Sequence, residues 1–523
     1  MSKRNDPALV VALLITLGLI GGGVWMLNRL SPGLIPGVGS SNPGGGGSLN
    51  PFSNSTLRVL GDTFSGYSTF RSQALQDALK ETGVTLQYDN EFDQAARAER
   101  LNNGEADLLV TTLDQFLQQQ PKGKIVALID RTVGADAVVL NTRQFPNLKS
   151  LLNLSQLVTQ ARSQGKSLGI AFAGDTPSEY LALVLDTKFE AFNLADFTVT
   201  RVADASEAYQ KMQDPANNLA IAILWEPFVT QARQQGQTVV LSSKDAPGAI
   251  IDVIVASDRL MQSNPELLIT FLEAYYRRID ANVSDSSQLQ TQIATDGKLS
   301  PTDAAAVIQG IDFFTAASAQ TWFSDGTLGT RISSTAAVLT LAGRLNAIPS
   351  DPKALYAPQF IAKAAANTQT LIELVRADNP ELGDRLAGKE RAVTSTALQA
   401  SQVQAAPDIG NLQVQGKVDF ATGSAQLTAQ GQQTLTALAR EIAEFNPQTV
   451  AIRVIGHTSR TGSAAFNQTL SQQRAQVVAN YLRGRGIRHT ISPEGRGFSQ
   501  PLPGVAPEAV QNQRTEIRLV RVN

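Results

Sequence analysis

The chain has 523 residues, enough for three or four domains of ordinary size. Apolar residues make up 42% of it and charged residues 17%, which favours folded domains with hydrophobic cores. The net charge of −2 gives no overall basic character, so we expect no nucleic-acid partner. Cysteine is absent, histidine occurs only at His457 and His489, and the P-loop, HExxH and GxSxG motifs are missing. We therefore expect no catalytic residues, no metal site and no cofactor.

The first recognisable element is an uncharged run of 20 residues from Ala8 to Leu27. As a helix it would measure about 30 Å, the thickness of the hydrocarbon core of a bilayer. Lys3 and Arg4 precede the run, which predicts a cytoplasmic N-terminus, a single inner-membrane span and periplasmic domains after it. The alternative is a cleaved signal peptide. The length of the run and the lack of an A-x-A cleavage site after it argue against that alternative.

Residues 31–55 contain seven Gly and four Pro, a composition that cannot bury enough apolar surface to fold. We expect this segment to be a flexible linker.

Short apolar segments and amphipathic segments alternate after the linker. The expected strands are 57–61, 84–89, 106–112, 167–174, 197–202 and 219–225, and the expected helices are 68–83, 92–104 and those beginning at Pro177 and Ser206. Strand–helix–strand alternation predicts an α/β fold with parallel sheets. Because the pattern occurs twice, we expect two lobes with a cleft between them.

Five segments in this region resemble one family. They are 101–117, 134–140, 174–183, 222–229 and 248–257, in that order along the chain. Together they resemble the periplasmic solute-binding proteins of ABC importers, of the type that binds nitrate, sulfonates or thiamine precursors. The resemblance covers residues 56–359. It implies a two-lobed fold that holds a small solute between the lobes, with an ABC permease as the partner for transport.

Ligands of open α/β sheets lie beyond the carboxyl ends of the strands. The residues expected to contact a solute there are Asp62, Ser65, Gly66, Tyr67, Thr111, Thr112, Thr176, Ser178, Trp225 and Glu226. The helix start at Thr176, with Pro177 and Glu179, is typical of a capping box, which either caps the helix alone or also offers N–H groups to an anion.

Two further observations bear on the solute. Trp225 either stacks on it or packs as a core aromatic. The expected turns carry Asp62, Asp175 and Glu226 but no Lys or Arg, which favours a neutral or amine-bearing solute over an oxyanion.

The region after the second lobe is expected to be mainly helical, including 265–279 and 334–345. Residues 360–410, rich in Ala, Gln and Thr, are expected to form a helical spacer.

Residues 411–523 carry the most specific pattern. A strand and helix are expected within 418–445, a strand at the start of 450–462, a helix over 467–487 and a closing strand within 512–520, which together form an α/β sandwich. The run GHTSRTG, followed by Asn467 and by LSQQRA, closely resembles the OmpA-like peptidoglycan-binding domain.

That resemblance implies capture of diaminopimelate in the peptide stem of peptidoglycan. The residues at motif positions are Thr458, Ser459, Thr461, Asn467, Arg474 and Arg514. Arg474 matches the arginine that would hold the carboxylate of the ligand. Ser459 stands where the family usually has Asp, so the partner for the ligand's ammonium is missing and binding is expected to be weak. His457, a lone histidine beside a tight turn, is expected to be structural.

The sequence thus predicts a membrane-anchored envelope protein that binds a small solute and associates with peptidoglycan. The alternative is a non-transporting envelope scaffold in which one or both modules have lost ligand binding. An enzyme related to thiamine-precursor synthesis is disfavoured because residues 1–415 contain no histidine.

Overall fold

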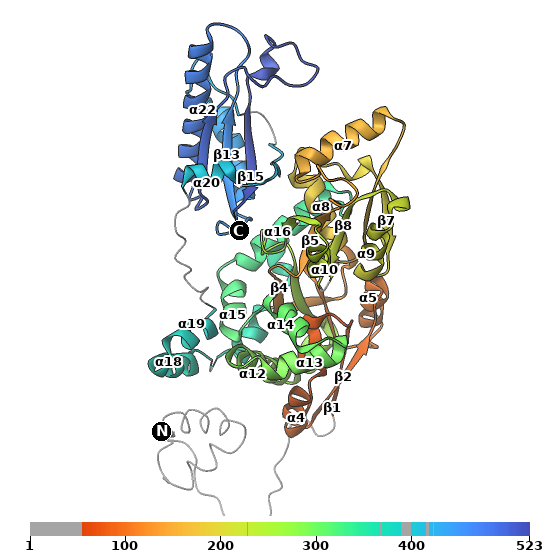
Figure 1. The fold of residues 1–523 in the computed structure, drawn as a ribbon. Helices are drawn as coiled ribbons and strands as arrows, with labels where there is room; N and C mark the ends of the chain where they lie inside the picture. The colour runs from red at the N-terminus through yellow and green to blue at the C-terminus, as the bar shows by residue number, and fades with distance from the viewer. Residues whose placement is uncertain are drawn as a thin grey trace, which may run out of the picture. The chain divides into compact units, whose positions relative to one another are not determined.

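The computed structural model describes residues 55–523 except 227, 367, 389–398, 415–417, 422 and 523 (Figure 1). The expected span at 8–27 and nearly all of the linker at 31–55 lie outside these residues. Within the described part of the chain, every helix is too short or too polar to cross a bilayer.

The described residues form three sheets. The first has the order β11-β4-β10-β3-β1-β2, and we call it, with its helices, lobe 1. Its strands are β1 (Ser55–Gly61), β2 (Val84–Asn90), β3 (Leu108–Thr112), β4 (Gly123–Thr132), β10 (Ile251–Ser257) and β11 (Ile311–Phe313). β1 pairs in parallel with β2 and β3, whereas β10 runs antiparallel to β3 and β4.

The second sheet, that of lobe 2, has the order β7-β6-β8-β5-β9. Its strands are β5 (Asp136–Leu140), β6 (Leu168–Ala173), β7 (Phe197–Val202), β8 (Leu219–Trp225) and β9 (Thr238–Ser242). The chain crosses from lobe 1 to lobe 2 between β4 and β5 and returns between β9 and β10. The two sheets agree with the two lobes that the sequence predicted. The expectation of parallel sheets was wrong, because β10 in lobe 1 and β5 in lobe 2 run antiparallel to their neighbours, so both sheets are mixed.

Lobe 1 differs from expectation at one helix. Its helical elements before the crossing are η1 (Ser65–Tyr67), α3 (Ser68–Arg71), α4 (Gln73–Glu81), α5 (Gln94–Asn102) and α6 (Leu113–Gln119). The expected helix 68–83 is therefore interrupted at Ser72, which has extended dihedral angles. The Ser72 hydroxyl accepts the N–H of Leu75, so serine caps a new helix in place of continuing the old one.

The helices of lobe 2 are α7 (Leu151–Ser163), α8 (Pro177–Lys188), α9 (Ala205–Gln213) and α10 (Phe228–Gln234). At the start of α8 the Thr176 hydroxyl accepts the N–H of Ser178, as expected of a cap. The Glu179 carboxylate accepts the N–H of Asp175 in place of that of Thr176, so the capping box closes one residue early.

The helices after β10 are α11 (Asp258–Ser263), α12 (Pro265–Ser284), α13 (Ser287–Gly297), α14 (Pro301–Gln309), α15 (Ala316–Ser324), α16 (Thr327–Leu341), α17 (Pro358–Ala364), α18 (Thr368–Asp378), α19 (Pro380–Leu386) and α20 (Ala400–Ala405). Of these, α16 contacts both α6 of lobe 1 and α8 of lobe 2. Tyr180, Leu183 and Val184 of α8 belong to the same hydrophobic cluster as the core of lobe 1. The two lobes are therefore joined by apolar packing.

The third sheet, with order β12-β15-β13-β14, forms the C-terminal domain. Its elements are β12 (Asp408–Asn411), α21 (Ala429–Ile442), β13 (Val450–Gly456), α22 (Ala464–Gly484), β14 (Ile491–Gly495) and β15 (Thr515–Arg521). The expected first strand near 418 makes only a single bridge, between Phe420 and Leu427. β12 takes the edge of the sheet because it pairs with β15 and buries Ile409 and Gly410.

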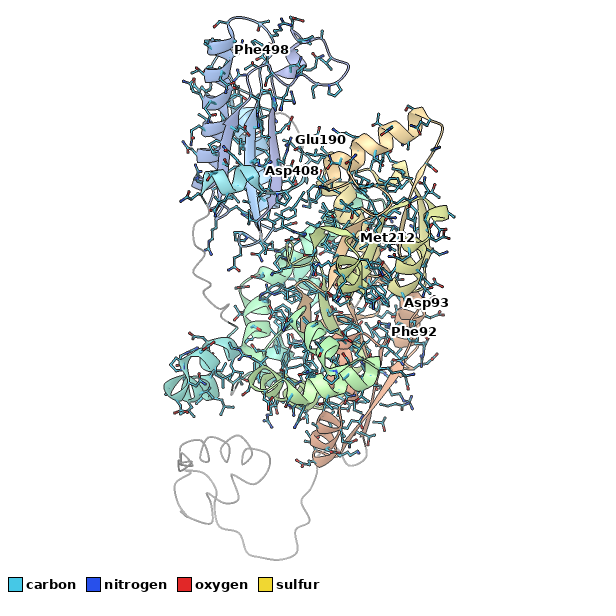
Figure 2. All side chains as sticks on the ribbon, viewed as in Figure 1. Phe92, Asp93, Glu190, Met212, Asp408 and Phe498 are labelled. Carbon is cyan, nitrogen blue, oxygen red and sulfur yellow. The ribbon has the colours of Figure 1, made fainter. Side chains whose placement is uncertain are left out.

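Lobe 2 and the C-terminal domain share a packed boundary. Phe189, just after α8, meets Phe445 edge-on with ring centroids 6.1 Å apart. The N–H of Glu190 donates to the carbonyl of Asn411 at 3.1 Å, so the loop after α8 meets β12, the strand that begins at Asp408 (Figure 2). The N–H of Asn446 donates to the carbonyl of Asp245 at 2.8 Å. The C-terminal domain is thus held against lobe 2 by backbone bonds as well as by side chains.

Candidate functional site

Three polar residues lie side by side at the end of the lobe 1 sheet where the chain crosses to lobe 2. Asp252 on β10 is in register with Thr112 on β3 and with Asp130 on β4. Residues directly opposite each other in antiparallel strands share a face of the sheet. Thr112, Asp252 and Asp130 are 6%, 1% and 0% exposed. We call these three residues the polar row.

The turn at 62–67 lies against the polar row. The Tyr67 hydroxyl donates to Oδ1 of Asp252. A Cβ on Gly66 would come within 2.2 Å of Oδ2 of Asp130, so glycine is required for the turn to approach the carboxyl group so closely. The structure therefore brings Gly66, Tyr67 and Thr112, three of the expected ligand residues, to one place.

Several buried oxygens at this place have no hydrogen-bond partner among the described residues except one another. They are both carboxyl oxygens of Asp130 and Oδ2 of Asp252. Buried polar atoms are nearly always hydrogen-bonded, and here the hydrogen bond available is the one between the two carboxyl groups themselves. The carboxyl oxygens require hydrogen-bond donors.

The pKa values of these carboxyl groups agree with their burial away from cations. Burial raises the pKa of Asp130 well above its usual range, and the charge of Asp312 raises it further. Burial does the same to the pKa of Asp252, with Asp130 as the next cause. Burial also raises the pKa of Asp136, at the start of β5, to about 7. The carboxyl groups of the polar row therefore hold a proton to higher pH than exposed carboxyl groups do.

Asp62, in the turn beside the polar row, is paired with a buried cation. Arg97 on α5 is 1% exposed, and its Nη2 lies 2.9 Å from Oδ2 of Asp62. The same side chain donates to the carbonyls of Val110, at 2.7 Å, and Glu91. The sequence shows no arginine in the turns themselves, and the structure supplies one from a neighbouring helix.

The other expected solute contacts are engaged elsewhere. Thr111 donates to Oε1 of Gln94 at 2.9 Å, while the Glu226 carboxylate accepts the N–H and hydroxyl of Thr230. Trp225 packs, partly buried, against a small core of lobe 2, and Ser65 opens η1. Among the described residues, Thr176, Trp225 and Glu226 make no hydrogen bond to the polar row.

The lobes are closed where α6 faces α8. Glu179 on α8 is an ion-pair partner of both Arg201, at 2.7 Å, and Arg344, which follows α16. Burial alone would raise the pKa of Glu179. The hydrogen bonds from Arg201 and from the N–H of Asp175, with the charges of Arg344 and Arg201, outweigh burial and lower that pKa. A cavity of about 10 Å³, lined by Asp114, Asp175, Glu179 and Arg344 among others, remains there. It has room for about one water molecule.

The C-terminal domain assembles most of its expected motif in the loop after β13. The Ser459 hydroxyl lies 3.1 Å from that of Thr461 and accepts from Nε2 of Gln513 at 3.2 Å. Asn467 donates to the carbonyl of Thr461 at 2.8 Å. Ser459, Thr458 and Asn467 are all buried, and the hydroxyl of Thr458 has no partner among the described residues.

Arg474 and Arg514 have different surroundings. Nε of Arg474 donates to the carbonyl of Ser424 at 2.9 Å, and its guanidinium lies 5.0 Å from the ring centroid of Phe420. In the described structure neither Nη atom of Arg474 makes a hydrogen bond, and no carboxylate pairs with it. Arg514, in contrast, is paired with Glu516 at 2.7 Å. Arg474 is therefore the arginine available to a ligand's carboxylate.

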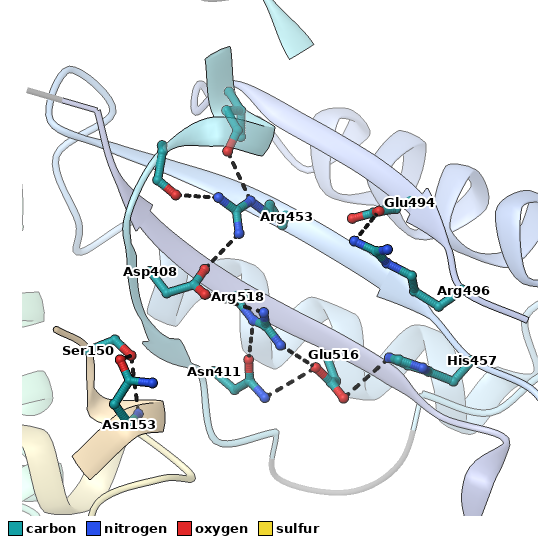
Figure 3. A network of polar contacts seen from close by, with 12 residues as sticks. Ser150, Asn153, Asp408, Asn411, Arg453, His457, Glu494, Arg496, Glu516 and Arg518 are labelled. Atoms are coloured by element: carbon teal, nitrogen blue, oxygen red, sulfur yellow. Dashed lines mark hydrogen bonds and ion pairs between the residues drawn. The ribbon is translucent and has the colours of Figure 1, made fainter. Parts of the chain in front are cut away.

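Glu516 on β15 is the centre of a charged network that sequence reasoning missed (Figure 3). Arg518 lies 2.8 Å and His457 3.3 Å from the Glu516 carboxylate, which also pairs with Arg514. Burial alone would raise the pKa of Glu516, but the hydrogen bond and charge of His457 and the charges of both arginines lower it to about 2. The network continues through Asp408, which pairs with Arg453 at 2.8 Å, and so ties β12 to the sheet.

Comparison with known proteins identifies the C-terminal region. Residues 419–515 match the model of the OmpA family. Outer membrane protein A of Shimwellia blattae is 42% identical over 86 residues, 16% of this chain and 36% of that protein. Outer membrane protein P5 of Haemophilus influenzae is 37% identical over 121 residues, 23% of this chain and 34% of that protein. The chain therefore spans about a third of the length of these relatives, and the shared part is an OmpA-like domain.

Solved structures resemble the two lobes. The match with the periplasmic aliphatic sulphonate binding protein SsuA from Escherichia coli covers 58% of this chain and 93% of the SsuA chain, with 16% identity and a TM-score of 0.44. The match with the periplasmic nitrate-binding protein NrtA from Synechocystis PCC 6803 covers 62% of this chain and 90% of the NrtA chain, with 13% identity and a TM-score of 0.45.

Proposed function

We propose that this chain is an envelope protein that attaches to peptidoglycan through residues 411–523 and holds a small solute between its lobes. Residues 8–27 would anchor it in the inner membrane, with both folded regions in the periplasm. The observation that supports attachment most directly is Arg474, a largely buried guanidinium that has no acidic partner in the described structure and belongs to an OmpA-like domain.

The chemistry of attachment follows from what surrounds Arg474. A guanidinium with free Nη atoms can bind a carboxylate of the peptide stem through two parallel hydrogen bonds. Ser459 and Thr461 offer hydroxyls, not a carboxylate, to the ammonium group of the same ligand. We therefore expect binding that depends on Arg474 and weakens as salt screens exposed charges.

Co-sedimentation of the full-length protein with purified peptidoglycan tests this proposal at low and high salt. Arg474→Ala should abolish pelleting, whereas Arg440→Ala, which removes the same charge from an exposed position on α21, should leave it unchanged. Ser459→Asp should tighten binding about tenfold or more by restoring an ion pair. Equal pelleting of wild type and Arg474→Ala would contradict the proposal.

The polar row supports the solute-binding part of the proposal, since it gathers buried carboxyl oxygens where solute-binding folds hold their ligands. A non-transporting scaffold is the competing function, and the apolar contact between α8 and α16 favours it. A thermal-shift screen of the full-length protein against small metabolites separates the two. A solute that stabilises wild type but not Thr112→Val supports binding, and a screen without such a solute supports the scaffold.

A further inference from the structure

We propose that the polar row binds the ammonium or guanidinium group of a small organic cation, and that this group replaces a proton shared by Asp130 and Asp252. The inference rests on the proposed solute binding and specifies the chemical class of the solute.

The atoms of the row carry the argument. Both carboxyl oxygens of Asp130 and Oδ2 of Asp252 are buried, and the one hydrogen bond given for them joins the two carboxyl groups to each other. The Tyr67 hydroxyl, which would be a donor to an incoming ligand, is already committed to the other oxygen of Asp252. Three acceptor atoms within one row match an ammonium group, which carries three N–H donors, or one edge of a guanidinium.

The charged and titratable groups that face the row from neighbouring elements are Asp62 and Tyr67 before and in η1, Arg97 on α5, Asp136 on β5, Tyr275 on α12 and Asp312 on β11. Two cations belong to these surroundings, and both are engaged. Arg97 is committed to Asp62 and to the carbonyls of Val110 and Glu91, and Arg131, next to Asp130 on β4, pairs with Asp312 at 2.7 Å. The field at the row is therefore negative. An oxyanion would meet carboxyl groups without a free cation, at a cost that burial makes large.

Without a ligand, a proton takes the place of the cation. Asp130 and Asp252 face each other in register, and two adjacent buried carboxylates cannot both be ionised at low cost. When an ammonium group enters, its N–H donors replace the shared proton, which leaves to solvent, and no covalent bond other than that O–H bond changes. Because one proton leaves for each cation bound, affinity should rise with pH by up to about tenfold per pH unit.

Isothermal titration calorimetry of the full-length protein tests this inference. The cationic probes are putrescine and agmatine, and the anionic probes are methanesulfonate and nitrate. We expect both cations to bind and neither anion to do so. Titration in two buffers of different ionisation enthalpy should show the release of about one proton per bound cation.

Asp130→Asn and Asp252→Asn should each weaken cation binding more than about tenfold and remove the proton release. The matched control is Asp107→Asn, which makes the same change just before β3, at the opposite end of that strand from Thr112, and should bind cations as wild type does. Binding of the anions alone, or of neither class, would overturn the inference. The proposed solute binding is tested separately by the metabolite screen. It would be contradicted only if that screen also found no ligand whose stabilising effect depends on Thr112.

Discussion

Lobe 1 and the C-terminal domain both bury carboxyl groups against a β-sheet, but in the described structure Asp130 and Asp252 of lobe 1 have no ion pair of the kind that Glu516 makes with two arginines. Glu516 is surrounded by His457, Arg514 and Arg518, and its pKa falls to about 2. Asp130 and Asp252 face one another without a cation, and burial raises the pKa of each well above its usual range. Burial is common to both places, so the supply of cations decides which carboxyl groups are charged.

The difference separates a structural cluster from a binding site. Glu516 has fixed partners on β15, just before β15 and just after β13, so it holds the sheet together and has no capacity left for a ligand. The polar row has unused acceptors and a proton that a ligand can replace. Neutralising a carboxyl group should therefore have opposite effects on stability at the two places.

The largest effect is expected at Glu516. Glu516→Gln leaves Arg514, Arg518 and His457 without their common anion, and the domain should lose about 3 kcal/mol of stability. Hydrogen exchange of the β13 and β15 amides in the full-length protein measures this loss, with exposed Glu508→Gln as the control.

The same substitution should change the response to acid. Because the pKa of Glu516 is lowered in the folded state, its contribution is complete above a pH of about 4.5 and disappears as the pH falls toward about 2. The difference between wild type and Glu516→Gln should close over that window. A constant difference down to pH 2 would show that the carboxylate does not hold the network by its charge.

A smaller effect of opposite sign is expected at Asp130. Asn at this position gives Asp252 a permanent N–H donor in place of a proton, so Asp130→Asn should stabilise the ligand-free protein by about 1 kcal/mol at pH 8. Because the pKa of Asp130 is raised in the folded state, the wild-type carboxyl pair stabilises the protein most at low pH and loses this contribution as the pH rises. The advantage of Asn over Asp should therefore be smaller at pH 5 than at pH 8. Urea unfolding followed by tryptophan fluorescence measures both values. Destabilisation at pH 8 would show that Asp130 is ionised and paired, as Glu516 is.

The smallest effect is expected at Arg344, whose side chain is 34% exposed and shares Glu179 with Arg201. Arg344→Ala should reduce stability by less than about 1 kcal/mol, because the apolar contact of α16 with α8 keeps the lobes together. Small-angle scattering of wild type and variant should then agree. A larger radius of gyration in the variant would identify Arg344 as the contact that closes the lobes.

Hydrophobic patterning predicted six of the eleven strands of the two lobes and the helix start at Pro177, whereas β4, β5, β9, β10 and β11 were not among the expected strands. The sequence also pointed to Gly66, Tyr67 and Thr112, because residues after strand ends gather at one edge of a parallel sheet. Asp130 and Asp252 were missed because each lies in an otherwise apolar strand, and only the register of β10 against β4 places them together. Their residue type was the available signal, since a carboxyl group inside a buried strand is unusual.

Two other features depend on distant parts of the chain. Arg97 reaches Asp62 from a helix 35 residues further along, and Arg344 reaches Glu179 across 165 residues. Local patterns carry no information about such pairs. In the same way, residues 408–410 were expected to belong to the helical spacer. They lie in a strand, β12, because they pair with β15.

The central claim is that the polar row holds a proton that a cation can replace, whereas Glu516 holds none. Infrared difference spectroscopy of the full-length protein at pH 7 detects the carbonyl stretch of a protonated carboxyl group directly. Asp136 and Asp280, with pKa values raised to about 7, contribute to this band in every variant, so the test is the difference between spectra. The account predicts a weaker band in Asp130→Asn than in wild type, an unchanged band in Glu516→Gln, and a band that weakens when agmatine is added to wild type. A band of wild-type intensity in Asp130→Asn, or one that agmatine leaves unchanged in wild type, would contradict it.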